Sequence, residues 1–168
     1  AGRVISSDPN WRPHLWDDPA EAAPILRRLV AGCDLVKISD DELGPLTGAS
    51  EVEAGARAVR GLGCALVVVT LGERGCYYDA PAGSGYLPGE KVKVVDTTGA
   101  GDAFMAGLLA ELAPRLSESG GRPASSLGKA EIERACARGN HLGALVVTQM
   151  GATSGLPRAR ISSLPPGE

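Results

Sequence analysis

The residue types best suited to chemistry lie in one glycine-rich stretch, residues 96–104, which reads Asp-Thr-Thr-Gly-Ala-Gly-Asp-Ala-Phe. Polar and apolar residues alternate over residues 91–95 before it, which predicts a strand, and residues 103–115 after it show helical periodicity. The stretch is therefore predicted to be a turn that opens a helix. Glycines let such a turn approach a ligand closely, and the free amides of a helix N-terminus, with roughly half a positive elementary charge, favour a phosphate or another anion.

The carboxylate of Asp102 falls in the first turn of this predicted helix and allows two interpretations. In a structural role it complements the helix dipole, an effect worth about 0.3 to 1 kcal/mol, while Asp96 or Thr98 caps the helix. In a chemical role it is a general base that takes a proton from a hydroxyl group attacking a phosphoryl group bound at the turn. The turn by itself leaves both interpretations open.

The composition is that of an ordinary globular protein, since 43% of the 168 residues are apolar and 22% are charged. No apolar run approaches the roughly 20 residues that a membrane-spanning helix needs, and no secretion signal is visible. A net charge of -3 without a basic cluster argues against nucleic acid as a partner. We expect a cytoplasmic protein with no membrane and no nucleic-acid contacts.

The cysteines and histidines suggest no metal or redox site. The cysteines are scattered, with no Cys-x-x-Cys pair, and each lies in or beside an apolar stretch, which predicts buried, reduced thiols. His14 and His141 have no second ligand at helical spacing, and we expect structural roles for both. The four cysteines are Cys33, Cys64, Cys76 and Cys136.

Predicted strands and helices alternate along the chain, as in a parallel sheet with helices on its faces. The strand predicted at residues 65–70 is apolar throughout, as expected for a central strand buried on both faces. Gly72 and Gly75 predict a tight turn from it into a return strand at residues 76–78, a hairpin at the sheet edge. The other predicted strands cover residues 3–7 and 34–39, and the predicted helices cover residues 19–31, 40–47, 51–60, 103–115 and 129–150.

The sequence also predicts helix faces and loops. Residues 80–90 are expected to form a loop or a weak strand, residues 117–128 a mobile surface loop, and the tail after Gly151 an extended segment. The expected apolar faces consist of Ala22, Ile25, Leu26 and Leu29 in helix 19–31 and of Ala106, Leu109 and Ala113 in helix 103–115.

Three polar residues follow the first predicted strand directly: Asp8, Asn10 and Arg12. In open α/β sheets, ligands bind outside the carboxyl ends of the strands, which makes these residues candidates for substrate contacts. The alternative is a polar turn in which Asn10 and Arg12 face water.

Several well-known motifs are absent from the sequence. There is no Gly-x4-Gly-Lys-Ser/Thr phosphate loop and no Gly-x-Ser-x-Gly nucleophile turn. Gly61-Leu62-Gly63 precedes a predicted strand, whereas a dinucleotide fingerprint follows one, and Phe104 occupies the place of the third glycine after Gly99 and Gly101. Nicotinamide cofactors are therefore not expected.

The stretch from Asp96 to Phe104 resembles the C-terminal signature of the ribokinase-like (PfkB) carbohydrate kinases. Other blocks resemble the fructokinases of that family in order and spacing, so the resemblance covers nearly the whole chain. These blocks are residues 8–16, 36–48 and 69–76 and the helix around Asn140 with Gly151-Ala152 after it. The resemblance implies an α/β fold with a mostly parallel sheet flanked by helices in a three-layer sandwich, and it implies a sugar kinase.

The resemblance also implies roles for the residues of the turn. Gly99, Ala100 and Gly101 would donate backbone N–H groups to the charge that develops on the transferred γ-phosphoryl group of ATP. Asp102 would deprotonate the sugar hydroxyl group. Asp96 and the Thr98 carbonyl, with the loop after Val147, would hold a monovalent cation such as K⁺.

The resemblance implies an ATP site with Mg²⁺ as well. Thr70 and Gly72 would lie along the phosphates and the ribose, and Asn140 would approach the adenine. Three residues of the 36–48 block would lie near the phosphates and the water shell of the metal. They are Lys37, Ser39 and Glu42.

Kinases of this family run to roughly twice the length of this chain, within the usual size of one α/β domain. Their N-terminal half supplies the sugar-binding residues, several strands and a β lid, and none of these is expected in residues 1–168. The chain therefore resembles the C-terminal part of a single kinase domain, with no second domain. We expect it to be inactive alone and to associate as a homo-oligomer, most simply a dimer, because an uncovered sheet edge invites pairing.

The resemblance leaves the substrate and the role of the isolated chain open. Fructose is the first candidate for the sugar, and 2-keto-3-deoxygluconate or another sugar of the family is the alternative. A different class of function, a nucleotide-binding or interaction module without catalysis, is the other hypothesis for the chain as it stands.

Overall fold

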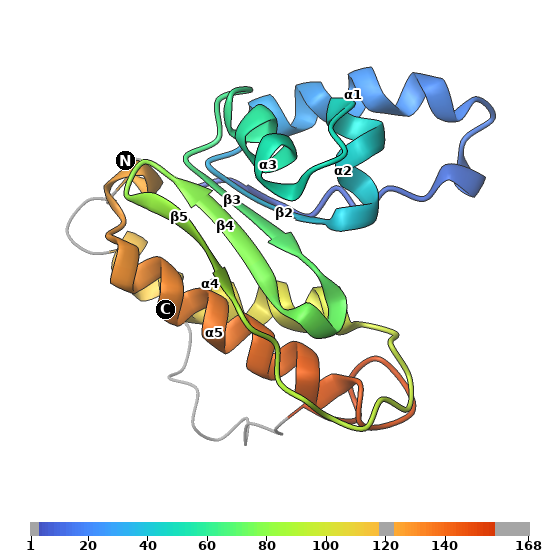
Figure 1. Ribbon diagram of the computed structural model, residues 1–168, viewed down its shortest axis with the longest axis vertical. Coiled ribbons are helices and arrows are strands. Elements are labelled where there is room, and N and C mark those ends of the chain that lie inside the picture. The colour runs from blue at the N-terminus through green and yellow to red at the C-terminus, as the bar shows by residue number, and fades with distance from the viewer. Residues whose placement is uncertain (1–3, 118–122, 157–168) are drawn as a thin grey trace, which may run out of the picture.

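A computed structural model describes residues 4–117 and 123–156 as three layers, a five-stranded sheet between two sets of helices (Figure 1). One face of the sheet carries α1 (Pro19–Ala31), α2 (Asp40–Thr47) and α3 (Val52–Arg60), and the other carries α4 (Ala100–Leu116) and α5 (Lys129–Val146). The strands are β1 (Ser6–Ser7), β2 (Leu35–Ser39), β3 (Leu66–Thr70), β4 (Cys76–Ala80) and β5 (Gly83–Leu87). The predicted α/β sandwich is confirmed. Within the described ranges, no helix is both long enough and apolar enough to cross a membrane.

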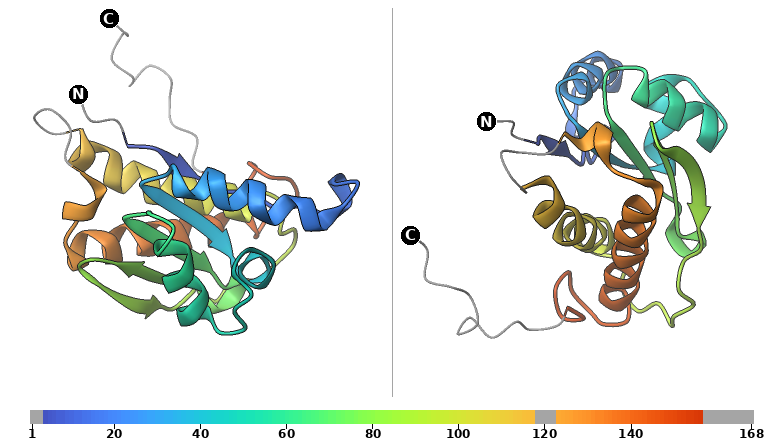
Figure 2. Two further views of the ribbon diagram at one scale, coloured as in Figure 1. Left: turned by 90° about the horizontal axis from the view of Figure 1, so that it is seen from above. Right: turned by 90° about the vertical axis from the view of Figure 1, so that its left-hand side faces the viewer.

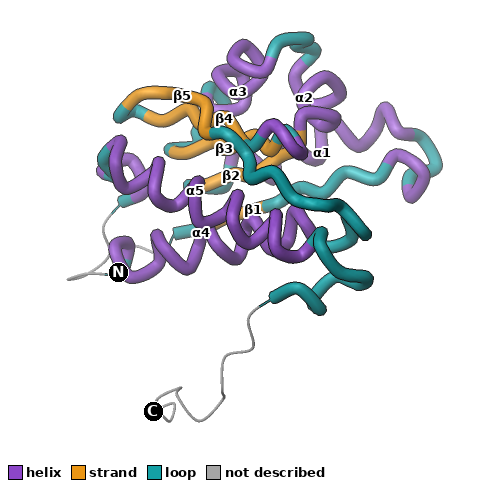
Figure 3. Tube along the Cα trace, turned by 60° about the horizontal axis from the view of Figure 1, so that its bottom comes forward, coloured by secondary structure: helices purple, strands orange, loops and turns teal. Residues whose placement is uncertain are grey.

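The strands follow one another across the sheet in chain order, between the two helix layers (Figure 3). β1, β2 and β3 are parallel, whereas β4 and β5 each run antiparallel to the preceding strand. β2 and β3 are buried on both faces because helices cover both sides, which explains their nearly continuous apolar sequences. The predicted hairpin joins β3 to β4 through the 3-10 turn η2 (Gly72–Arg74), and β5 extends the sheet beyond it.

The register of the parallel strands brings their carboxyl ends together. Ser7 lies opposite Val36, and Ser39 lies opposite Thr70. Asp8, the next residue after β1, is therefore level with Lys37. Because side chains alternate along a strand, Lys37 points to the same face as Leu35, which packs with α4 and α5.

Each face of the sheet has its own hydrophobic core, between the sheet and the helices that cover that face. Figure 2 shows the two helix layers on either side of the sheet. Val36, Ile38, Val67 and Val69 pack against α1, α2 and α3, and the alternate residues of the same strands pack against α4 and α5. All four cysteines are buried and free, as predicted. Burial raises the pKa of the Cys64 thiol to about 11, so this thiol stays protonated and unreactive at neutral pH.

Two glycines let α4 and α5 cross in close contact. A Cβ atom at Gly107 would lie 2.7 Å from the carbonyl oxygen of Arg138, and one at Gly139 would lie 3.0 Å from the ring of Phe104. Gly139 is therefore the point at which α5 contacts α4. This crossing fixes α4 against the sheet and so positions its N-terminal turn.

The structure corrects the helix faces that were predicted from the sequence. In α4 the large residues Phe104, Leu108 and Leu112 are buried, because they remove much apolar area from water. Of the predicted face, Leu109 is partly buried against the core, while Ala106 and Ala113 are exposed. In α1 the predicted face is wrong in part. Ala22 is buried, but Ile25 and Leu29 are 42% and 48% exposed.

The predicted strand at residues 91–95 is also wrong. The segment 88–95 is irregular and pairs with none of the described strands; it runs instead beside the end of α5, where the amide of Val95 donates to the Val147 carbonyl at 2.7 Å. Residues 83–87 form a strand, the second of the two alternatives for that region.

Other boundaries differ from the prediction. α5 ends at Val146, although a helix to residue 150 was predicted. Residues 152–156 form turns and a bend where an extended tail was predicted. In the predicted loop 117–128, residues 124–126 form a short 3-10 turn, η4 (Ala124–Ser126). Residues 118–122 of that loop and the tail beyond residue 156 lie outside the described residues.

We predict that Gly107→Val lowers the free energy of unfolding by about 1 to 3 kcal/mol, since overpacking a tight contact typically costs that much. Ala106→Val, at the exposed neighbouring position, is the matched control, because it introduces the same β-branched residue into the same helix. Urea unfolding of both variants gives the measurement. Equal losses of stability in the two variants would show that the helix crossing is not tight at Gly107.

Candidate active site

The turn before α4 is held in shape by the carboxylate of Asp96. Its Oδ1 accepts hydrogen bonds from the backbone amide of Thr98 at 2.9 Å and from the Thr98 hydroxyl at 2.7 Å, and its Oδ2 accepts one from the Gly151 amide at 2.8 Å. These bonds to Thr98 and Gly151 favour the ionised form and lower the pKa of Asp96 below its usual value of 3.8. The N-cap of α4 is Gly99, with no side-chain cap, so the expectation that Asp96 or Thr98 caps the helix is wrong.

The two glycines of the turn are required by contacts within the protein. Gly99 adopts the left-handed conformation with φ of 79°, and a Cβ atom there would lie 2.7 Å from the Ala152 carbonyl oxygen. A Cβ atom at Gly101 would lie 2.7 Å from the Nζ atom of Lys37. The amides of Gly101 and Asp102 find no acceptor in the described part of the chain, so they remain available to an anion.

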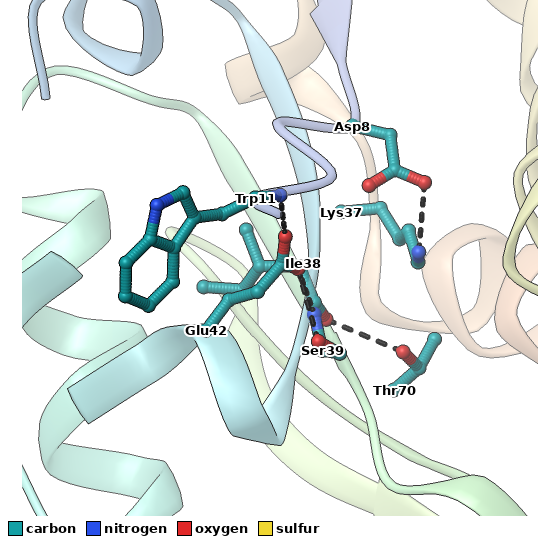
Figure 4. A network of polar contacts seen from close by, with 7 residues as sticks. All are labelled: Asp8, Trp11, Lys37, Ile38, Ser39, Glu42 and Thr70. Atoms are coloured by element: carbon teal, nitrogen blue, oxygen red, sulfur yellow. Dashed lines mark hydrogen bonds and ion pairs between the residues drawn. The ribbon is translucent and has the colours of Figure 1, made fainter. Parts of the chain in front are cut away.

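A buried ion pair lies beneath this turn (Figure 4). The Nζ atom of Lys37 is 2.7 Å from Oδ2 of Asp8, and the two side chains are only 6% and 16% exposed. A buried ammonium group needs such a partner. The pair fixes a positive charge against the first turn of α4, where it adds to the helix dipole. Asp8, predicted as a substrate-side residue, contacts Lys37 here.

A cavity opens beside the turn, between η2, the 88–95 segment and the facing sides of α4 and α5. Its volume is about 650 Å³, which is in the ordinary range for a site that binds a small ligand. One wall is apolar, with Val92, Val94 and Val147 among its residues, and cationic side chains, Arg74 and Lys91, also line the cavity. The predicted site residues that line it are Thr70, Gly72, Ala100, Gly101 and Asn140.

Asp102 lies in the first turn of α4 and is exposed. It makes no hydrogen bond or ion pair with any other described residue, and it does not line the cavity. Its carboxylate is therefore unengaged, which a general base requires and a purely structural carboxylate does not. Asn10 and Arg12 are likewise without polar side-chain contacts to the rest of the described chain; Asn10 is exposed and has a positive φ of 48°.

Ser39 and Glu42 lie at the start of α2 and do not line the cavity. Oε2 of the Glu42 carboxylate accepts hydrogen bonds from the Ser39 amide at 2.7 Å and from the Ser39 hydroxyl at 3.0 Å, and Oε1 accepts one from the amide of Trp11 (Figure 4). Across residues 4–117 and 123–156, no group of three or more His, Cys, Asp or Glu side chains is arranged to hold a metal ion.

Asn140 lines the cavity and also holds one of its walls. Its Nδ2 atom donates to the Pro88 carbonyl at 3.1 Å, and His141 next to it lies 2.9 Å from Glu90. Both contacts tie the start of the 88–95 segment to α5. Close backbone contact between Gly75 and Gly89, where neither position has room for a Cβ atom, fixes the same segment against η2.

Sequence reasoning missed this wall of the cavity. Val92 and Val94 were assigned to a half-buried strand, although their alternation does place both on one side, toward the cavity. Arg74 lies in the 69–76 block but was given no role there, and Lys91 lies in none of the blocks, so only the fold brings both to the site. The Asp8–Lys37 pair was also missed, although the pairing of β1 with β2 places the two residues side by side.

The chain matches the family described as pfkB family carbohydrate kinase over residues 2–159. It is 38% identical to a fructokinase of Vibrio alginolyticus and 35% identical to an aminoimidazole riboside kinase of Salmonella typhimurium, each over 157 residues. Each match covers 94% of this chain but only 48% and 46% of those proteins, so the chain spans about half the length of the relatives it matches.

Solved structures show the same relationship. The structure of fructokinase from Vibrio cholerae O395 in a form with bound fructose, ADP and calcium matches 92% of this chain and 47% of its own, with a TM-score of 0.77 and 38% identity. Aminoimidazole riboside kinase from Salmonella enterica, complexed with aminoimidazole riboside and an ATP analog, also has a TM-score of 0.77, with 34% identity over 92% of this chain and 49% of its own. The family match covers nearly the whole chain, and the chain belongs to the pfkB family of carbohydrate kinases.

Proposed function

We propose that the intact protein transfers the γ-phosphoryl group of ATP to a hydroxymethyl group of a small sugar, with fructose as the first candidate. The observation that carries the proposal is the N-terminal turn of α4. It combines unpaired backbone amides, the buried Lys37 ammonium group beneath them and the unengaged carboxylate of Asp102. The fructokinases among the relatives support the choice of substrate.

In this proposal the chain's own groups position and stabilise the reacting phosphoryl group. The unpaired amides of Gly101 and Asp102 and the Lys37 ammonium group offset the negative charge that develops during transfer, and they are already in place before ATP binds. The predicted donor at Ala100 instead donates to the Thr97 carbonyl at 3.2 Å. Asp102 accepts the proton of the attacking hydroxyl group. ATP occupies the 650 Å³ cavity with its base toward the apolar wall and Asn140 and its phosphates toward Thr70, Gly72 and the turn.

The ions fit this site to different degrees. Mg²⁺ would neutralise the phosphates of ATP, and Ser39 and Glu42, which are hydrogen-bonded to each other, are the residues proposed to lie near its water shell. A monovalent cation such as K⁺ fits better beside Asp96. Oδ2 of Asp96 accepts one hydrogen bond and keeps a lone pair for a cation, and the Thr98 carbonyl is the proposed second ligand.

A second sugar is a specific alternative, because the Salmonella relative is named for aminoimidazole riboside. 2-Keto-3-deoxygluconate stays among the alternatives. For the 168 residues alone we propose a nucleotide-binding unit that phosphorylates no sugar and forms dimers, since the chain spans about half the length of the relatives. The proposed domain is one kinase domain, of which residues 1–168 are the C-terminal part, in a cytoplasmic protein.

We predict that Asp102→Asn in the full-length kinase lowers kcat with fructose at least about 10²-fold, because general base catalysis typically contributes 10² to 10⁴. Asn has the same size and lacks the proton-accepting charge, so binding of ATP should stay within about twofold of wild type. Steady-state kinetics and calorimetric titration give the two numbers. Retention of more than about a tenth of the wild-type rate would exclude Asp102 as the base.

Gly101→Ala should weaken ATP binding by about tenfold or more. The added methyl group collides with the Lys37 ammonium group and displaces it, and a hydrogen bond to a charged group is worth about 1.5 to 3 kcal/mol. The control is Gly32→Ala, because a Cβ atom there makes only ordinary contacts and Gly32 is far from Gly101 in the sequence. If the two variants bind ATP equally well by calorimetry, Lys37 is not part of the phosphate site.

Asp96 should contribute stability that depends on pH. Because its pKa is lowered in the folded chain, this contribution is fully present above the unfolded pKa, near the usual 3.8, and is lost as the pH falls through the folded value. Asp96→Asn should therefore be less stable than wild type at pH 7, and the difference should shrink below about pH 3.8. Urea unfolding across pH 2 to 7 measures it. A difference that stays constant with pH would contradict the assignment.

A further inference from the structure

We propose that Glu42 is a positioning residue whose carboxylate seats the loop after β1, so that Asp8 lies against Lys37 under the N-terminus of α4. Its role is then to preorganise the phosphate site. The inference rests on the proposed function only for its ATP-binding test.

Asp8 is not held in place by its own contacts alone. One carboxylate oxygen bonds Lys37, while the other, Oδ1, is buried and has no hydrogen-bond partner among the described residues. A buried acceptor without a partner is unfavourable. Asn10, two residues later, has a φ of 48°, a left-handed conformation that Asn adopts more readily than most residues other than glycine. The ion pair with Lys37 alone therefore does not account for the position of the loop.

The Glu42 carboxylate supplies that contact (Figure 4). Its Oε1 accepts the backbone N–H of Trp11, three residues after Asp8, and its Oε2 accepts the amide and the hydroxyl of Ser39, at the end of β2. One carboxylate therefore joins the loop after β1 to the strand that carries Lys37. Glu42 is only 7% exposed, and its two oxygens accept three hydrogen bonds from the protein, which hold the carboxylate in one orientation.

The side chain of Trp11 anchors the same loop. It lies beside Ile38 and Leu46 at a small void of about 10 Å³, barely the volume of one water molecule, and its Nε1 atom is buried. The chain contains one other tryptophan, Trp16. In a Trp16→Phe background, fluorescence thus reports the position of Trp11 alone.

Glu42→Gln tests the contact directly. The side-chain oxygen of Gln is best used by the two donors of Ser39, which leaves its NH₂ group facing the Trp11 N–H, so that bond is lost. We expect hydrogen exchange of the Trp11 amide, measured by NMR, to become at least about tenfold faster relative to that of Val68 in β3. The emission of Trp11 should also shift to longer wavelength. Glu51→Gln, at an exposed position, is the matched control and should change neither.

A second measurement needs no variant. In the wild-type chain the Trp11 amide must exchange slowly, although it lies outside helices and strands. Exchange as fast as that of an unstructured peptide would overturn the proposal even if Glu42→Gln did not fold. The proposal would also be overturned if the Glu42→Gln variant folds and both the hydrogen exchange of its Trp11 amide and the fluorescence emission of Trp11 are unchanged.

ATP binding distinguishes a positioning residue from a metal ligand. Glu42→Gln should raise the Kd for ATP by the same factor in EDTA and in Mg²⁺, and its effect should not add to that of Asp8→Asn, because both act through Lys37. A change seen only with Mg²⁺, or full additivity, would contradict the proposal. If the wild-type chain binds no ATP in either buffer, the proposed function fails, and the exchange of the Trp11 amide still decides the role of Glu42.

Discussion

The buried ammonium group of Lys37 is the constraint around which the site is built. A charge removed from water must be paired, and the pairing carboxylate, Asp8, comes from a different strand. The space for the ammonium group comes from a third element, since Gly101 leaves room where any Cβ atom would collide with it. β1, β2 and α4 must therefore meet at one point, which is also where the amides of α4 are unpaired.

The rest of the fold holds that meeting point in place. The close crossing of α4 and α5 at Gly107 and Gly139 sets the position of α4 on the sheet. Asp96 fixes the turn before α4 by binding both Thr98 and Gly151, so the chain before α4 and the chain after α5 are tied together. The 88–95 segment, tied to α5 through Asn140, then forms the outer wall of the cavity. The contacts that stabilise the fold around α4 thus also position the proposed site.

Much of this arrangement follows from the sequence, because local patterns determine it. Three local patterns predicted the structure correctly: the apolar run of β3, the turn residues Gly72 and Gly75, and the glycine-rich start of α4. The Asp8–Lys37 pair depends on strand register between distant segments, which no local pattern contains. The face of α4 was mispredicted because alanine spacing is a weaker signal than the burial of large side chains. Residues 91–95 form no strand despite their alternation, because no described strand lies beside them to pair, and Val92 and Val94 line the cavity instead.

The most direct test of the account is the response of backbone amides to ATP. In ¹⁵N-labelled chain titrated with ATP in EDTA, the amide resonances of Gly101 and Asp102 should show the largest shifts, with smaller shifts at Thr70 and Gly72 and none at Gly83 in the distant β4–β5 turn. This outcome would place the phosphates at the N-terminus of α4. Binding of ATP that leaves the resonances of Gly101 and Asp102 unchanged would contradict it.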